Sequence, residues 1–343
     1  YAGYLEKGKD VEQVFRELEH ADGIVCAEPD YLCYSLSSQE VFYPFDDAVV
    51  AQRWHLRAVR AAEAWKKLED RGIRPGEGTV VAVVDTGVSL QHPELFDNLW
   101  YNAAEAAGEE GVDDDGNGYV DDIYGVNLVN SFTDMTDSCG HGTQMAGIIG
   151  LGPGAAGSVG IAYGSRVMPV KIGTDRNFGT DAAVEGIRYA AANGADVINM
   201  SFGTYHDSLL LRTAIQEASE HCMLAAAAGN EGLPTENDYL DQEAGNVYPA
   251  AYPEVVGVMA LDMQEKIGSY SNWDADPGEG AEYELAAPGS AVYSTLPVGT
   301  YDNISGTSPA AAMVSGAMAV YRSMYPDRER NPAAWLQKHF VEC

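Results

Sequence analysis

The chain has 343 residues, of which 46% are hydrophobic, and its 52 acidic residues outnumber 20 basic ones, for a formal net charge of −32. We expect one large domain with a smaller accessory piece, because a chain of this length buries a large core. The charge argues against nucleic acid or an anionic membrane surface as a partner. No apolar run approaches the roughly 20 residues of a membrane span. The composition fits a secreted or cell-envelope protein, or one that binds cations. Five scattered cysteines lack the CxxC spacing of a metal site.

Residues 1–45 are predicted to form a separate small piece of α+β structure. Residues 10–19 carry apolar side chains at helical spacing, and residues 24–27 follow a turn and resemble a short strand. This piece is too short to fold well alone, so we expect it to pack on the main body, residues 46–343.

The main body is predicted to alternate strands and helices. A continuous β-branched apolar run at 79–84 indicates a strand buried on both faces. Further strands are predicted at 166–172, 196–200, 223–228, 255–260 and 283–289, with helices at 61–68, 181–193, 209–222 and 333–340. Such alternation is typical of an α/β fold in which a mostly parallel, doubly wound sheet has helices on both faces.

Three polar residues occupy positions where such folds place catalysis. Asp85 directly follows the strand at 79–84, and Asn230 follows the strand at 223–228. His141 lies between glycines before an apolar helical stretch, and histidine is the usual general base. The alternatives are ordinary: a turn Asp, a turn Asn and a structural His.

Ser308 precedes a run of small residues with helical character. Pro309 is expected at the first helical position, which would put the Ser308 hydroxyl beside free N–H groups at the positive end of a helix. Such a place suits a nucleophile that must stabilise an oxyanion. The alternative is a serine that only caps the helix.

An acidic, glycine-rich loop carries oxygen ligands at alternating positions. Asp113, Asp115, Asn117 and Asp121 match the front half of a calcium-binding loop. Tyr124 stands where an EF-hand has its glutamate, so a complete EF-hand is absent. The alternative is a solvated acidic loop without Ca²⁺.

Four blocks, in order, resemble the subtilisin-like serine proteases, or subtilases. They are Val83-Val84-Asp85-Thr86-Gly87, His141-Gly142-Thr143, Ala227-Ala228-Gly229-Asn230 and Gly306-Thr307-Ser308, within a resemblance that covers about 46–330. The order Asp, His, Ser is that of subtilisin itself. The resemblance implies a serine endopeptidase that cleaves peptide or protein substrates through an acyl-enzyme. Ser308 would be the nucleophile, His141 the base, Asp85 its orienting partner, and Asn230 with the Ser308 N–H the oxyanion hole.

The same resemblance implies a substrate pocket. Its walls would be Ser201, Phe202, Gly203, Ala226, Ala227 and Ala228. Val247 sits where relatives often have glycine, so we expect a shallower pocket that prefers small or medium side chains. Pro309 replaces the methionine that usually follows the nucleophile.

Residues 1–45 resemble the latter half of a subtilase propeptide, a folding chaperone and inhibitor whose tail lies in the cleft. We therefore expect a zymogen, or a chain with its own propeptide bound, that cleaves itself between about 34 and 50. Two alternatives remain: an inactive relative that binds peptides or a partner protease in the same cleft, and an acyl transferase.

Overall fold

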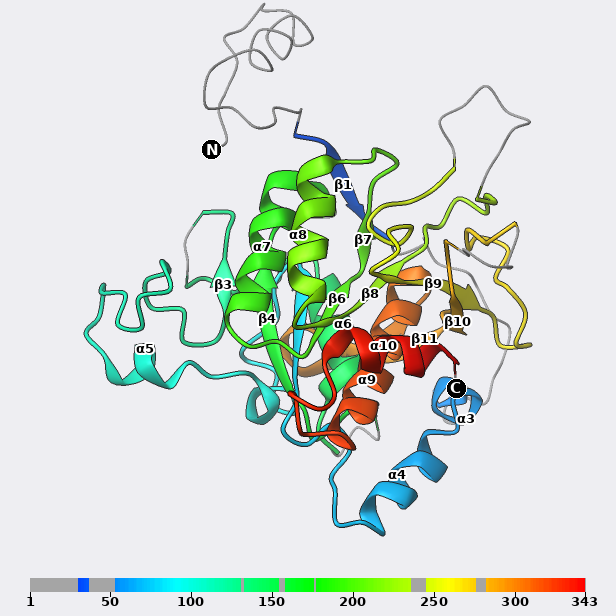
Figure 1. Cartoon of the computed structure of the whole chain (residues 1–343). Coiled ribbons are helices and arrows are strands. Elements are labelled where there is room, and N and C mark those ends of the chain that lie inside the picture. The colour runs from blue at the N-terminus through cyan, green and yellow to red at the C-terminus, as the bar shows by residue number, and fades with distance from the viewer. Residues whose placement is uncertain are drawn as a thin grey trace, which may run out of the picture.

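A seven-stranded parallel sheet forms the centre of the molecule (Figure 1). The computed structural model describes residues 30–36, 53–130, 133–153, 158–175, 177–235, 245–275 and 282–342. The strand order is β10-β9-β8-β6-β2-β4-β3. The strands are β2 Val80–Asp85, β3 Val126–Asn127, β4 Arg166–Lys171, β6 Val197–Met200, β8 Met223–Ala227, β9 Val256–Leu261 and β10 Leu285–Pro288.

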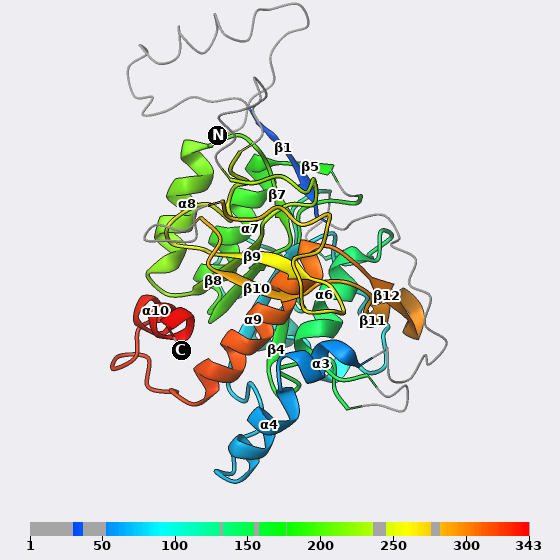
Figure 2. The ribbon, with the colours of Figure 1, turned by 90° about the vertical axis from the view of Figure 1, so that its right-hand side faces the viewer.

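Helices cover both faces of the sheet (Figures 1 and 2). α7 and α8 pack together on one face, while α6 and α9 pack together on the other. The bounds are α6 His141–Gly150, α7 Thr180–Ala192, α8 Leu209–Ser219 and α9 Thr307–Ser323. Shorter helices lie at the periphery: α3 Trp54–Ala58, α4 Ala61–Glu69, α5 Ala103–Ala107, α10 Ala333–Glu342 and the 3₁₀ turns Phe96–Asn98 and Pro297–Gly299.

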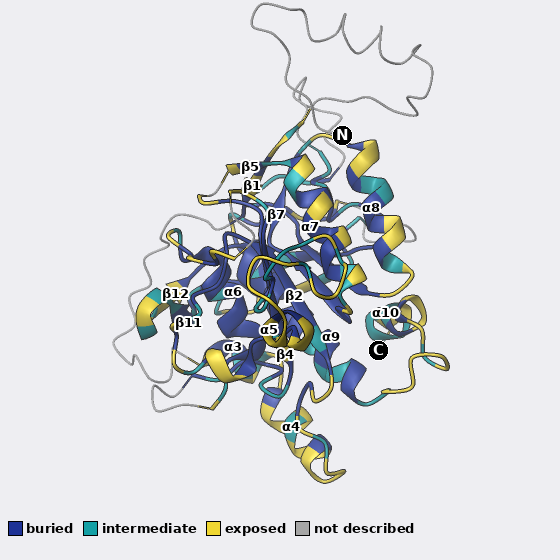
Figure 3. Cartoon of the chain, turned by 90° about the vertical axis from the view of Figure 1, so that its left-hand side faces the viewer, coloured by how far each residue is buried: buried dark blue, intermediate teal, exposed yellow. Residues whose placement is uncertain are grey.

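The alternation of side chains along each strand explains this two-sided core. In β2, Val81 and Val83 belong to the core cluster that contains α6 and α9, whereas Ala82 and Val84 belong to the cluster that contains α7 and α8. Successive side chains of a strand point to opposite faces, and both faces here are apolar. The central strands are accordingly buried, while α4 shows a largely exposed surface (Figure 3).

The expected α/β architecture is therefore confirmed, with strand and helix bounds shifted by one to three residues in most cases. The predicted start of α9 is wrong by two residues, because α9 begins at Thr307 rather than at Pro309. Gly306 has φ +146°, a backbone conformation that side-chain-bearing residues rarely adopt, so the chain turns into the helix directly after it. Ser308 is consequently the second residue of the helix.

A smaller antiparallel sheet lies beside the main one, in the order β5-β1-β7 (Figure 2). It joins β1 Leu32–Ser35 to β5 Asn177–Gly179 and β7 Phe202–Gly203. We call residues 30–36 the leader segment. The sequence did not predict these strands, nor the hairpin of β11 Val292–Leu296 and β12 Thr300–Ile304. The helix expected at 10–19 and the strand expected at 24–27 lie outside the described residues, as does the boundary near residue 45.

Among the residues that the structure describes, no helix combines the length and apolar character needed to cross a membrane.

Candidate active site

The carboxyl edge of the parallel sheet gathers the polar residues that follow its central strands. Asp85 ends β2, and Asn230 follows β8 by three residues. The helices α6 and α9 begin at the same edge, which brings His141 and Ser308 toward Asp85 and Asn230. In open α/β sheets this edge is where ligands bind.

Asp85 and His141 form a buried pair. The Nδ1 atom of His141 lies 2.8 Å and 2.9 Å from the two carboxylate oxygens of Asp85, and the exposed fractions of the two side chains are 1% and 2%. The Thr86 N–H donates to Asp85 Oδ1 at 2.7 Å and fixes the carboxylate. A carboxylate at Nδ1 holds the proton on that nitrogen and leaves Nε2 free to accept one. Within the described residues, the buried Nε2 has no hydrogen-bond partner.

Asp137 ties the loop after Asp85 to the helix that carries His141. Its carboxylate accepts hydrogen bonds from Gly140 N, Thr143 N, Thr143 Oγ1 and Thr86 Oγ1 at 2.7–2.9 Å. Asp137 could not be predicted from the helix-start pattern, because the N-cap position directly before His141 is Gly140, and Asp137 lies three residues further back. Asp137 is 3% exposed, and its four hydrogen bonds position His141.

Ser308 lies in the first turn of α9 and is fully buried. Its hydroxyl donates to the carbonyl oxygen of Ser201 at 3.0 Å, and the Ser201 hydroxyl donates back to the Ser308 carbonyl at 3.1 Å. The backbone N–H of Ser308 donates to the carbonyl oxygen of Leu36 at 3.2 Å. A free N–H of the first helical turn thus contacts a peptide carbonyl of the leader segment.

The side chain of Asn230 is oriented by Thr307. Asn230 Oδ1 accepts from the Thr307 N–H at 2.8 Å and from the Thr307 hydroxyl at 3.1 Å. Because Oδ1 is engaged, Nδ2 is the atom available to another acceptor. Nδ2 is buried and has no hydrogen-bond partner among the described residues, which is unusual for a buried polar group and typical of a functional one.

The leader segment runs antiparallel to β5 and β7. Tyr34 pairs with Gly203 and Ser35 with Phe202, and the Leu36 N–H donates to the Ser201 carbonyl at 3.1 Å. On the other side, residues 32–34 pair with β5. An extended peptide added between two strand edges in this way is a common mode of peptide recognition.

The side chains of the leader segment alternate between buried and exposed. Cys33, Ser35 and Leu36 are buried, whereas Leu32 and Tyr34 are 47% and 45% exposed. Leu36 belongs to the core cluster that also contains Val247 and Ala227. A Cβ atom added to Gly203 would lie 2.3 Å from Val247 Cγ1 and 3.2 Å from Leu36 Cδ1, so glycine is required for the Leu36 side chain to enter.

The structure places the expected pocket residues in two groups. Ser201, Phe202 and Gly203 contact the leader segment through the backbone bonds above. Of the three alanines, Ala227 shares the core cluster of Leu36, whereas Ala226 and Ala228 belong to the cluster under α7 and α8.

The acidic loop brings together a different set of carboxylates from the one that alternation in sequence suggested. Carboxylate oxygens of Glu105, Asp115 and Asp122 all lie within 4.8 Å of one another. Of the four residues expected from the sequence, Asp115 belongs to this cluster and Asn117 contacts it through its side-chain amide. Asp113 accepts hydrogen bonds from the backbone of Gly116, Asn117 and Gly118, and Asp121 accepts from Gly111 N.

The donor set of this acidic cluster suits a hard cation. Glu105 and Asp122 are buried, and burial raises the pKa of Asp122, as does the nearby Asp115 carboxylate. No arginine or lysine forms an ion pair with the three carboxylates within the described part of the chain. The side-chain amide nitrogens of Asn102 and Asn117 donate to the carboxylates of Asp115 and Asp122. These residues fit Ca²⁺.

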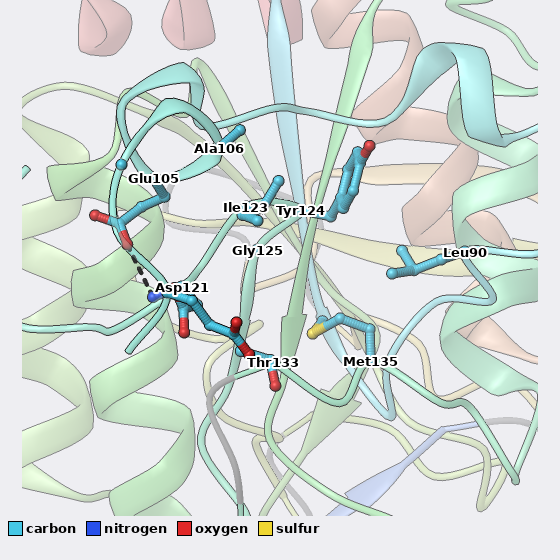
Figure 4. Close-up of a pocket in the computed structure, with 11 residues that line it drawn as sticks. Leu90, Glu105, Ala106, Asp121, Ile123, Tyr124, Gly125, Thr133 and Met135 are labelled. Carbon is cyan, nitrogen blue, oxygen red and sulfur yellow. Dashed lines mark hydrogen bonds between the residues drawn. The ribbon is translucent and has the colours of Figure 1, made fainter. Parts of the chain in front are cut away.

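A cavity of about 430 Å³ adjoins the acidic loop (Figure 4). Glu105 and Asp121 border it on one side, where the Glu105 carboxylate accepts from the Asp121 N–H at 2.8 Å, and Leu90 and Met135 border it on the other. None of Asp85, His141 and Ser308 lines this cavity.

Comparisons with known proteins agree with this geometry. Residues 76–340 match the sequence profile of Peptidase_S8, the Subtilase family. The chain is 32% identical to subtilisin DY of Bacillus licheniformis over 76% of this chain and 82% of the relative, and 34% identical to the major intracellular serine protease of Bacillus subtilis over 78% of this chain and 74% of the relative. It is 29% identical to subtilisin-like protease 1 of Plasmodium berghei over 82% of this chain, and covers 48% of that relative.

Fold, site and relatives together define a hydrolase of the serine endopeptidase class. The chain belongs to the subtilase family. Its relatives include a protease named as intracellular beside subtilisins, so family membership does not decide the compartment.

Proposed function

We propose that the chain cleaves peptide bonds through an acyl-enzyme on Ser308, and that its first substrate is its own leader, cut after Leu36. One observation carries the proposal: the Leu36 carbonyl oxygen accepts a hydrogen bond from the Ser308 N–H, while the Leu36 N–H pairs with Ser201. The carbonyl of Leu36 thus lies beside the nucleophile, in an extended strand, as a scissile carbonyl must. On this proposal, residues up to Leu36 are a propeptide segment and the catalytic domain follows.

The chemistry follows from the atoms present. Ser308 Oγ rotates from the Ser201 carbonyl to His141 Nε2, loses its proton to that nitrogen and attacks the carbonyl carbon. The Ser308 N–H and Asn230 Nδ2 donate to the resulting oxyanion. The C–N bond then breaks, the amine leaves with the proton from His141, and an ester on Ser308 remains. Water, deprotonated by the same nitrogen, hydrolyses this ester and restores the serine.

Protein chemistry tests the cleavage site directly. The wild-type chain, after incubation at neutral pH, is expected to yield a new N-terminus at Ser37, whereas the Ser308→Ala chain stays intact. A fluorophosphonate probe is expected to label Ser308 in the wild type and nothing in the variant. An intact, unlabelled wild type would overturn the proposal and favour a relative that only binds peptides in this cleft. A new terminus elsewhere would overturn the assigned bond.

Val247 is proposed to limit the side chain accepted before the cleaved bond. Its methyl group borders the same space as Gly203 and the tip of Leu36. We expect peptides with Leu at this position to be cleaved in preference to peptides with Phe or Tyr. Val247→Gly is expected to shift kcat/KM toward Phe by at least about 10- to 200-fold, the range that a single methylene group produces in an apolar pocket. An unchanged Leu-to-Phe ratio would overturn this role.

Ca²⁺ is proposed to bind Glu105, Asp115 and Asp122 in the acidic cluster. When bound, the ion offsets two of the three negative charges of these carboxylates and stabilises the loop. Removal of Ca²⁺ with a chelator is expected to lower the Tm of the wild type and to leave the Asp115→Asn variant, already lower, unchanged. Glu110→Gln serves as a control, because Glu110 borders the cavity without joining the cluster. A wild-type Tm indifferent to chelator would overturn the site.

A further inference from the structure

Two carboxyl groups from distant parts of the chain meet where the leader segment enters the cleft. Asp30 lies two residues before β1, and Asp181 lies in the first turn of α7. A Cβ atom placed on Gly179 would lie 2.2 Å from Asp30 Oδ2 and 2.6 Å from Asp181 Oδ1. Both carboxyl groups therefore converge over the same glycine, and Asp30 belongs to the leader segment.

Asp30 is fixed in this position by hydrogen bonds to α7. Its Oδ1 accepts from the Asp181 N–H at 3.0 Å and from the Thr180 hydroxyl at 3.1 Å. The helix needs such an acceptor, because its N-cap residue is Gly179, which has no side chain. The Tyr31 N–H donates to the Thr180 hydroxyl at 3.0 Å, and the Tyr31 carbonyl accepts from the Thr180 N–H at 2.9 Å.

The surroundings disfavour two negative charges at this place. Burial raises the pKa of Asp181, and the charge and hydrogen bonding of the Asp30 carboxyl raise it further, against the hydrogen bond from the Ala182 N–H. Neither carboxylate forms an ion pair with a lysine or arginine among the described residues. The other titratable groups nearby are the Cys33 thiol, whose pKa burial raises to about 12, and the imidazole of His206, which stacks on Tyr31 at 4.7 Å.

We propose that one proton shared between Asp30 and Asp181 holds the leader segment in the cleft, so that the segment binds tightly at acid pH and is released as the pH rises. The inference rests on the proposed function in one respect, that this cleft is the substrate cleft. The direction of this pH dependence follows from the linkage between proton binding and leader binding. A carboxyl whose pKa is higher in the bound state takes up a proton when the leader segment binds. The proton therefore stabilises the bound leader fully below about pH 4, and this stabilisation is lost as the pH rises through the pKa of the bound state.

Cys33 reports whether the leader segment is seated, because its thiol is fully buried in the bound state. We would use the full-length chain with Ser308→Ala, which keeps the leader attached. Alkylation of Cys33 by iodoacetamide would be followed by peptide mass spectrometry between pH 4.5 and 7.5. Each rate is divided by that of the synthetic peptide of residues 30–36 at the same pH, which removes the ionisation of the thiol itself.

The normalised rate is expected to rise over this range, since the proton that stabilises the bound leader segment is lost as the pH increases. Adding Asp30→Asn is expected to keep the rate low and within about twofold, because the amide keeps the Oδ1 acceptor and removes one charge. Asp181→Asn should do the same. Glu185→Gln is the matched control on the same helix, since Glu185 contacts the Tyr119 hydroxyl, and should preserve the rise.

Two outcomes would overturn the proposal: a pH dependence that survives Asp30→Asn, or a high rate at every pH in that variant. Neither depends on catalysis, because the readout is made without the Ser308 hydroxyl. Failure of the proposed function would instead be seen as the absence of a Ser37 terminus in the wild type.

Discussion

The buried polar groups at the two edges of the central sheet differ in whether they have hydrogen-bond partners. At the amino edge, Asp196 directly precedes β6 and is 3% exposed. Its carboxylate accepts from the Val80 N–H at 3.0 Å and pairs with Arg322 and Arg328. At the carboxyl edge, His141 Nε2 and Asn230 Nδ2 are buried without a partner in the described part of the chain. Satisfied groups at one edge support the fold, and unsatisfied groups at the other edge are available to substrate.

Because of this difference, we expect substitutions at the two edges to affect different properties, catalytic activity at one edge and folding stability at the other. Substitutions at the carboxyl edge are expected to change turnover with little change in the free energy of unfolding. Substitutions at the amino edge should do the reverse.

The largest effect is expected for Ser308→Ala. Loss of the hydroxyl removes the nucleophile, and kcat should fall on the order of 10⁶-fold, the magnitude known from subtilisin, itself a member of this family. The midpoint of thermal unfolding should stay within a few degrees, since the Ser308 hydroxyl makes one hydrogen bond among the described residues, to the Ser201 carbonyl. Peptide hydrolysis and calorimetry measure the two quantities. Ser219→Ala, in α8, is the control and should keep full activity; a Ser308→Ala chain that retains turnover would show that another group is the nucleophile.

At the opposite edge, Asp196→Asn should act on stability. It leaves the buried guanidinium of Arg322, which is 7% exposed, without its counter-charge. Breaking a buried pair in this way costs about 3–5 kcal/mol of unfolding free energy. Urea titration measures this loss of unfolding free energy. Arg328→Ala is the matched comparison, because Arg328 is 62% exposed and its pair should contribute less than about 1 kcal/mol. Equal losses of unfolding free energy in the two variants would contradict the conclusion that the buried pair of Asp196 with Arg322 supports the fold.

Asn230→Ala tests the unsatisfied amide. Without its Nδ2 donor, kcat should fall by about 10²–10³ with a small change in KM, a magnitude measured on the corresponding asparagine of subtilisin. Asn230 also accepts from Thr307, so an orienting role must be distinguished from donation. Asn230→Asp keeps the acceptor and loses the donor. If Asn230→Asp retained near-normal kcat in steady-state assays, donation to an oxyanion would be refuted.

The same comparison shows what could be predicted from the sequence. Asp85, His141 and Ser308 each stand at the end of a strand or the start of a helix, so local patterns locate them, and the topology of a parallel sheet then brings strand ends together. The strands β2, β4, β6 and β8 were predicted within two residues for the same reason, because each is a short apolar run.

Contacts between segments that are distant in the sequence could not be predicted from local patterns. The leader segment pairs with strands about 145–170 residues away, and β5 and β7 are too short to show a period. In the acidic cluster, Glu105 of α5 lies with Asp122 rather than with Asp121. Asp121 has a positive φ of +54°, a backbone conformation that the alternation of residues in the sequence does not predict.

Glu284 is expected to give the smallest effect, and it is an exception to the pattern at the amino edge because its carboxyl has no basic partner among the residues that the structure describes. It directly precedes β10, and its carboxyl accepts from the Gly257 N–H at 2.7 Å. Burial raises the pKa of Glu284 to about 7, and its acidic neighbours Asp274 and Glu282 raise it in the same direction. A carboxyl with a raised pKa in the folded state contributes stability that is complete below about pH 4.5 and is lost as the pH rises through 7. Between pH 5 and pH 8 the unfolding free energy should fall on the order of 2 kcal/mol, and Glu284→Gln should flatten the profile. Urea titrations at several pH values measure this, and a Glu284→Gln chain that loses stability as steeply as wild type would assign the loss to other groups.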